Sequence, residues 1–171
     1  MSLQDLSVLA GMVPNDSRPP VELWHPEHCG DIDIRIDRRG DWYHEGGLIG
    51  RPALVRLFAS ILRKDGEDYV LVTPAEKMRI QVEDLPFQIV LLERDGDAIH
   101  AITNVGDTLT LGLKHPLQLS EVGGQPLPCV EIRAGLMARF GRNAYYQLVD
   151  WAEERAGRYW VTSAGQSFEI G

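Results

Sequence analysis

The sequence predicts an α+β protein with two tandem lobes, in which a β-β-α-β-β unit occurs twice and each antiparallel sheet carries one helix. The main observation is a repeated motif. Its first copy runs from Gly50-Arg51 through an apolar helix pattern to Val72-Thr73-Pro74-Ala75, and its second copy runs from Gly141-Arg142 to Val161-Thr162-Ser163-Ala164 at nearly the same spacing. A repeated unit indicates two similar lobes, and two lobes create a seam in which a ligand could bind.

Three segments follow from the hydrophobic pattern. Residues 1–20 are predicted to form an N-terminal helix and linker, because apolar residues recur at helical spacing from Leu3 to Met12 and a polar, proline-containing stretch comes next. Residues 21–85 form the N-terminal α+β lobe, and residues 86–171 form the C-terminal α+β lobe. The boundary is set at Leu85-Pro86, where the pattern changes.

The first lobe contains one hairpin, one helix and two further strands. Isoleucine alternates with charged residues from Asp31 to Asp37, which is typical of a strand with one buried face. Pro52 suits the first turn of a helix, and Arg63 and Lys64 are expected at the helix C-terminus, where the dipole favours cations. The expected elements are strands at 31–37 and 42–45, a helix at 51–64, and strands at 69–73 and 77–82.

The second lobe is expected to open with a β-meander that has no helix, at residues 87–122. Asp95-Gly96 within it is a typical hairpin turn. The second copy of the repeat then follows the meander. Its expected elements are hairpin strands at 129–133 and 136–140, a helix at 143–155, and strands at 159–162 and 167–170.

Composition limits the classes of function. The formal net charge is −8, from 25 acidic and 17 basic residues. Proteins that bind extended nucleic acid need a basic surface that releases counterions, so the charge argues against that class. The first residues lack the basic start and the long apolar run of a signal peptide or membrane span, and we expect a cytoplasmic protein. Cys29 and Cys129 are expected to be reduced thiols.

Several phrases of the sequence resemble the bacterial domain-of-unknown-function family 1285. They are Gly40–Gly46 (GDWYHEG), Gly50–Ala59 (GRPALVRLFA), Leu71–Ile80 (LVTPAEKMRI) and Thr103–Asp107 (TNVGD). The resemblance extends from about residue 18 to the end of the chain. It implies a duplicated α+β core and a C-terminal half similar to pleckstrin-homology-like domains. It further implies a site for a nucleotide-like ligand between the halves and a role in signal transduction, and it transfers no catalytic residue.

The two helix starts are the first candidate ligand contacts. A helix N-terminus presents free N–H groups and a partial positive charge, which favour an anion. Arg51 and Arg142 would add guanidinium groups suited to phosphate or carboxylate, and Gly50 and Gly141 would allow a ligand to approach closely. The alternative is that both are ordinary surface helix starts with solvated arginines.

A charged strand after the first helix is the second candidate. On a strand, Lys77 and Arg79 share one face with Gln81, while the intervening residues face the other way. This polar face lines a ligand groove or is simply solvated, and Thr73 would place a hydroxyl beside it. Trp42 and Tyr145 could stack on a base, although large aromatic side chains more often fill a core.

The remaining polar groups indicate structural roles. Arg133 and Arg139 are expected to form ion pairs with Asp33, Asp37 or Glu131. His25, His28 and Cys29 lack the second ligand set that a closed zinc site needs, so neither a metal nor a cofactor is expected.

We therefore expect a small anionic or nucleotide-like ligand at the seam between the lobes, bound by a regulatory protein. Two alternatives stay open. One is an enzyme acting on a small phosphorylated or acidic substrate, with His44 or Asp107 as acid or base. The other is a protein-interaction module that binds a peptide or partner through its pleckstrin-like half.

Overall fold

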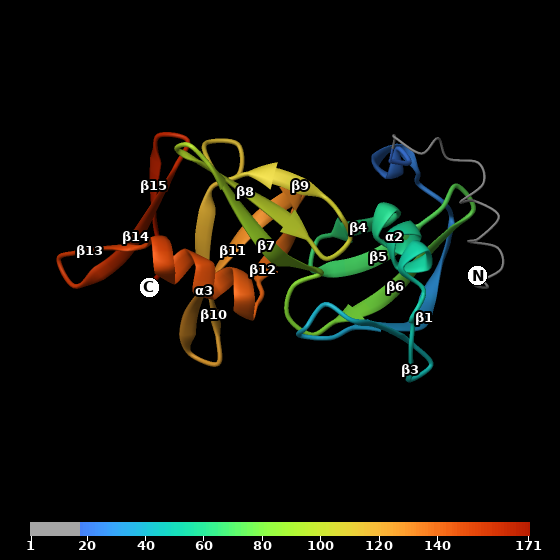
Figure 1. Cartoon of the computed structure of the whole chain (residues 1–171). Coiled ribbons are helices and arrows are strands. Elements are labelled where there is room, and N and C mark those ends of the chain that lie inside the picture. The colour runs from blue at the N-terminus through green and yellow to red at the C-terminus, as the bar shows by residue number, and fades with distance from the viewer. Residues whose placement is uncertain (1–17) are drawn as a thin grey trace. The chain divides into compact units, whose positions relative to one another are not determined.

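The computed structural model describes residues 18–171, which belong to two compact units, one ending at Glu83 and one running Asp84–Gly171 (Figure 1). Within these residues each unit contains a six-stranded sheet and one α-helix, so the prediction of two tandem sheet-dominated lobes is confirmed. The helix predicted within residues 3–12 lies outside the described residues. Neither α-helix of the described part is long and apolar enough to cross a membrane.

The first unit orders its strands β3-β2-β1-β6-β5-β4. A short 3-10 helix, η1 (Val21–Leu23), precedes the sheet, and helix α2 (Pro52–Ser60) connects its two halves. The strands are β1 (His28–Ile36), β2 (Trp42–His44), β3 (Gly47–Leu48), β4 (Leu62–Asp65), β5 (Asp68–Val72) and β6 (Glu76–Val82).

A parallel pair of strands joins the two antiparallel halves of this sheet. Strand β1 pairs with β2 in the antiparallel sense and with β6 in the parallel sense. The long connection that contains α2 permits this arrangement, because parallel neighbours need a crossover of a dozen or more residues. The prediction of a purely antiparallel sheet is therefore wrong. The parallel register sets Cys29 opposite Lys77 and Asp31 opposite Arg79.

The predicted first helix is too long at its C-terminal end. Helix α2 stops at Ser60, and Arg63 belongs to strand β4, where it pairs with Val70. A tight turn at Gly66 folds β5 back onto residues 62–65, which therefore form strand β4. Gly66 has a φ of 60°, a value that suits glycine. The second copy differs from its prediction in the same way, with a strand directly after its helix. The two copies therefore share the order β-β-α-β-β-β, and the first copy has one additional short strand, β3, before its helix.

Aromatic packing anchors α2 to the first unit. Trp42 on β2 is 1% exposed, and Phe58 on α2 is fully buried. Their rings stack with centroids 6.0 Å apart and an interplanar angle of 18°. Ile34 and Ile36 of β1 are also fully buried, which confirms the isoleucine face predicted from the alternating pattern.

The second unit orders its main sheet β10-β11-β12-β7-β8-β9 and adds a three-stranded sheet, β13-β14-β15. Helix α3 (Arg142–Trp151) lies between β12 and β13 in the chain. The strands are β7 (Phe87–Asp95), β8 (Ala98–Thr103), β9 (Thr108–Thr110), β10 (Leu117–Val122), β11 (Gln125–Arg133), β12 (Leu136–Phe140), β13 (Glu153–Arg155), β14 (Arg158–Ser163) and β15 (Gln166–Glu169).

A parallel pair also joins the halves of this second sheet. Strand β12 pairs with β7, and Phe140 lies opposite Ile89. The predicted meander is correct only for β7, β8 and β9, because β10 leaves it and pairs with β11 at the far edge. Pro126 and Pro128 concealed the full length of β11, since proline is uncommon inside strands.

Helix α3 is fixed to β7 by side chains and by a close backbone approach. Ala144 and Leu148 are fully buried, and the amide of Gln147 both donates to and accepts from the backbone of Leu92 at 2.9 Å. A Cβ added at Gly141 would come within 3.1 Å of the Ile89 carbonyl oxygen. A side chain here would crowd this carbonyl, so glycine favours close packing on β7, which differs from the predicted role of admitting a ligand.

A buried ion pair ties the start of the second unit to its sheet. The guanidinium of Arg139 donates to both carboxylate oxygens of Asp84, at 2.9 and 3.0 Å. It also donates to the Leu127 carbonyl and the Ser120 hydroxyl, both at 2.9 Å. Arg133 pairs with Asp107 at 3.3 Å. Both arginines thus form structural ion pairs as predicted, with aspartates that were not among the predicted partners.

Replacing Trp42 by alanine is expected to lower the free energy of unfolding of the first unit by about 3–5 kcal/mol, because it leaves a cavity beside Phe58. The matched control is Leu48→Ala on the adjoining strand, because Leu48 is 62% exposed. This substitution should change the free energy of unfolding by less than about 0.5 kcal/mol. Urea denaturation measures both. Equal effects of the two substitutions would contradict this description of the core.

Asp84→Ala should destabilise the second unit by about 3–5 kcal/mol, since it leaves the charge of Arg139 buried without its carboxylate. The exposed pair of Arg158 and Glu169 supplies the control: Arg158→Ala should cost less than about 1 kcal/mol. Chemical denaturation followed by circular dichroism compares the two variants. A cost below about 1 kcal/mol for Asp84→Ala would show that the buried pair does not stabilise the unit.

Candidate functional site on the first sheet

A shallow pocket of about 270 Å³ lies on the polar face of the first sheet. The strand register brings its lining residues together from β1, β4, β5 and β6, with Val70, 4% exposed, among them. The neighbouring positions on the same strands, such as Leu71 and Met78, are buried in the core. The charged residues that line the pocket are Asp31, Asp65, Asp68, Lys77 and Arg79.

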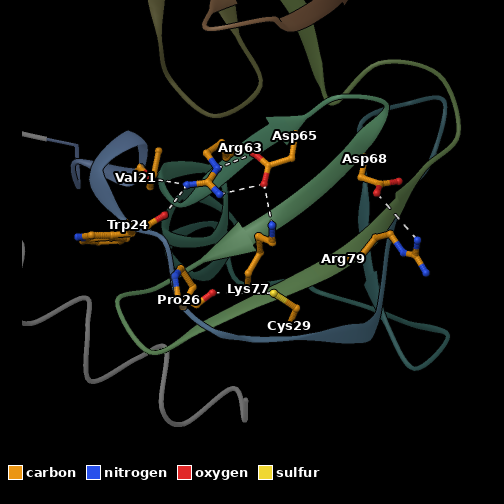
Figure 2. A network of polar contacts seen from close by, with 9 residues as sticks. All are labelled: Val21, Trp24, Pro26, Cys29, Arg63, Asp65, Asp68, Lys77 and Arg79. Carbon is orange, nitrogen blue, oxygen red and sulfur yellow. Dashed lines mark hydrogen bonds and ion pairs between the residues drawn. The ribbon is translucent and has the colours of Figure 1, made fainter.

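Arg63 holds one wall of this pocket in place (Figure 2). Its Nη1 donates to the carbonyl oxygens of Val21 and Trp24, both at 2.7 Å. Its Nε and Nη2 donate to the two carboxylate oxygens of Asp65, at 2.7 and 2.9 Å. The fork-shaped guanidinium thus connects η1 and the segment after it to β4, and it fixes the orientation of Asp65.

Asp65 is shared between two cations. Besides Arg63, it accepts a hydrogen bond from Lys77 Nζ at 3.1 Å. The hydrogen bond from Arg63 lowers the pKa of Asp65, burial opposes this effect, and the hydrogen bond from Lys77 lowers the pKa further. The carboxylate is therefore held ionised, and it positions the Lys77 ammonium at the pocket.

Arg79 is paired more loosely. Its Nε donates to Asp31 at 2.7 Å, and this hydrogen bond raises the pKa of Arg79. Its Nη1 is 3.9 Å from Asp68, which is too long for a hydrogen bond. More than half of the Arg79 side chain is exposed, as is more than half of each aspartate. The terminal amino groups of Arg79 can therefore reach a ligand without breaking the contact with Asp31.

The pocket presents charged groups of both signs. An ammonium has three donors and a guanidinium has five, and the contacts described above use only part of them. Lys77 and Arg79 can therefore donate to an anionic group. In the described part of the chain, the ion-pair partner of Asp68 is Arg79, whose Nη1 lies 3.9 Å away. The Asp68 carboxylate can therefore accept a hydrogen bond from a cationic group or another donor. Cys29 adds an exposed thiol at the rim.

Lys77 and Arg79 are the two predicted site residues that the structure brings together. Thr73 is 5% exposed, and its Oγ1 accepts from the backbone N–H groups of Ala75 and Glu76 in the turn before β6. Trp42 lies in the core, so its ring offers no surface to a ligand. Arg51 is exposed and precedes the first residue of α2, but it does not line the pocket.

The predicted residues of the second unit lie elsewhere. Arg142, the first residue of α3, donates from Nε to the Tyr146 hydroxyl at 3.1 Å, and this hydrogen bond raises the pKa of Arg142. Tyr145 lines a separate, mainly apolar pocket. The two helix starts also differ, because α2 begins at Pro52 and α3 begins at Arg142. The matched Gly-Arg pairs therefore occupy different positions relative to their helices.

The alternative acid and base candidates have local contacts. His44 Nε2 is 3.9 Å from its exposed neighbour Glu45. Asp107 accepts from Arg133 at 3.3 Å, and its backbone N–H donates to Thr103. Among residues 18–171, no three histidine, cysteine or acidic side chains gather as metal ligands.

Sequence reasoning missed Arg63 and the three aspartates of the pocket. The prediction placed Arg63 in a helix and lacked strand β4. In a strand over residues 62–65, Arg63 and Asp65 share a face. Asp31 was visible as part of the alternating pattern of β1. Its position beside Arg79 required the parallel register, which the sequence pattern does not reveal.

Comparisons with known proteins agree on one family. The model of the DUF1285 N-terminal domain matches residues 19–85, and that of the DUF1285 C-terminal domain matches residues 86–170. A crystal structure of a DUF1285 family protein from Silicibacter pomeroyi DSS-3 shares 38% identity and a TM-score of 0.85, covering 96% of this chain and 93% of that one. A crystal structure of a DUF1285 family protein from Shewanella baltica OS155 shares 30% identity and a TM-score of 0.54, and the match covers 68% of this chain and 90% of that one. The comparison with curated proteins gives no match.

The charge network predicts a pH dependence of stability. The folded pKa of Asp65 is lowered, so its stabilising effect is present above the unfolded pKa, near 3.9, and is lost as the pH falls through the folded pKa. Asp65→Asn should therefore show a weaker loss of unfolding free energy on acidification below about pH 4 than the wild type. Lys77→Met should raise the pKa of Asp65 measured by NMR titration. An unchanged pKa in Lys77→Met would contradict the network.

Proposed function

The chain belongs to the DUF1285 family, and we propose that its N-terminal unit binds a small polar molecule that carries both an anionic and a cationic group. The single observation that carries this proposal is the meeting of Lys77 and Arg79 with three aspartates around one pocket. Lys77 and Arg79 would take the anionic group, and Asp68 would take the cationic group.

The carboxylates narrow the ligand class. Three aspartates beside two cations would repel a ligand of high negative charge, such as a nucleoside triphosphate. A zwitterion offers each sign of the pocket a partner and avoids this repulsion. The proposal therefore keeps the anionic group expected from the sequence and adds a cationic one. A pocket of about 270 Å³ suits a molecule of amino-acid size.

A binding or regulatory role fits this pocket better than turnover. Arg63 and Lys77 lower the pKa of Asp65, which makes this carboxylate a weak proton acceptor as well as a poor proton donor near neutral pH. The cytoplasmic location, the signalling role, the pleckstrin-like character of the second unit and a ligand at the seam between the lobes stay predictions.

The test is calorimetric titration of the full chain with matched probes. Phosphoethanolamine and the zwitterionic amino acids present both charges, inorganic phosphate presents only the anion, and ethanolamine presents only the cation. At least one zwitterion should bind with a Kd below about 1 mM, which corresponds to roughly 4 kcal/mol. Phosphate and ethanolamine should bind at least about tenfold more weakly than that zwitterion, because each engages only one sign of the pocket.

Two variants link the binding to the pocket. Arg79→Gln removes the exposed guanidinium and should weaken the binding of the tightest zwitterion at least about tenfold, or roughly 1.4 kcal/mol. Arg56→Gln removes an exposed arginine of α2 outside the pocket and should leave the affinity unchanged. The proposal fails if no zwitterion binds below about 1 mM, or if the two variants bind equally well.

A further inference from the structure

We propose that the C-terminal unit has a second ligand site, a mainly apolar pocket that binds an uncharged, flat, aromatic molecule. This site is separate from the charged pocket of the first unit, and it does not depend on the function proposed above. Its volume is about 390 Å³. Helix α3, strand β14, the start of β11 and the residues that follow β15 all contribute to its lining.

Helix α3 has more apolar surface than its packing uses. Ala144 and Leu148, spaced i and i+4, are fully buried. Tyr145 and Val149, spaced i and i+4, line the pocket together with Ala152, the residue that follows the helix. Val149 remains 46% exposed in the described structure, so this surface is available to a ligand. Burying such apolar surface removes it from water and so stabilises a complex.

Tyr159 on β14 and Ile170, which follows β15, also line the pocket. The backbone of Tyr159 exchanges hydrogen bonds with Gly171 and Ile170, at 2.9 Å each, which holds these last residues against β14. Its side chain is 50% exposed. Tyrosines thus come from two separate elements, α3 and β14, and their flat rings suit a flat aromatic partner.

The charge of the lining selects the ligand. None of the residues that line this pocket within the described part has a charged side chain. An anionic group buried here would find no cationic side chain to compensate its desolvation, so an anionic ligand is disfavoured. The amide of Gln125 and the tyrosine hydroxyls supply the hydrogen-bonding groups that could orient one polar substituent.

The volume sets the size of the ligand. A cavity of about 150 Å³ holds benzene, and ligand sites generally occupy about 300–1,000 Å³. The pocket, at about 390 Å³, therefore has room for a molecule of two or three rings. This pocket is larger and much less polar than the one between β1 and β6, so the two sites would take different compounds.

The experiment uses 2-naphthol as an uncharged bicyclic probe and 2-naphthoate as its charged counterpart. Both are titrated into the full chain labelled with ¹⁵N, and amide shifts are followed by NMR. We expect 2-naphthol to bind with a Kd below about 1 mM and to shift amides of α3 and β14, with 2-naphthoate at least about tenfold weaker. Shifts confined to other elements, or equal affinity for both probes, would overturn the proposal.

Val149 and Val90 provide a matched pair of variants. They are 46% and 44% exposed, both belong to the second unit, and only Val149 lines the pocket. Val149→Glu should lower the affinity for 2-naphthol at least about tenfold, because it brings a charge into the apolar lining. Val90→Glu should leave the affinity within about twofold of the wild type. Equal effects of the two substitutions would overturn the proposal, and the amide spectrum of each variant checks that it is folded.

Discussion

The parallel pairing of β1 with β6 is the constraint on which the candidate site depends. It joins two antiparallel halves of the first sheet that are far apart in sequence. Its register sets Asp31 opposite Arg79 and Cys29 opposite Lys77. Because side chains alternate along a strand, the same register directs these polar residues to one face and the buried core residues to the other. A shift of one residue would exchange the two faces and remove the pocket.

The ion pairs of the pocket both hold it together and limit what it can bind. Arg63 uses most of its donors on Asp65 and on two backbone carbonyls, so its role is structural. Lys77 and Arg79 each donate to a different aspartate but keep donors for a ligand. A purely anionic ligand must compete with the aspartates, whereas a ligand with both charges can satisfy them. In the proposed function, the pairing of charges is what favours small zwitterions over highly charged anions.

Sequence patterns predicted the elements better than their pairing. The isoleucine alternation of β1 and the polar face of β6 were predicted correctly, because both follow from a period of two residues. Strands β4 and β13 were not predicted, because each directly follows a helix. Leu62 continues the apolar pattern of the first helix, and the charged residues of β13 resemble the end of the second. The parallel pairs were missed as well, since register across a long connection depends on tertiary packing. For the same reason two cations of the site were predicted and its aspartates were not.

A crystal structure of the full chain with the tightest-binding zwitterion would show whether the polar face of β1 and β6 is a ligand site. We expect the anionic group of the compound within hydrogen-bond distance of Lys77 Nζ and the Arg79 guanidinium, with its cationic group beside Asp68. A compound bound away from this face, or bound there without contact to either cation, would rule out the proposed site.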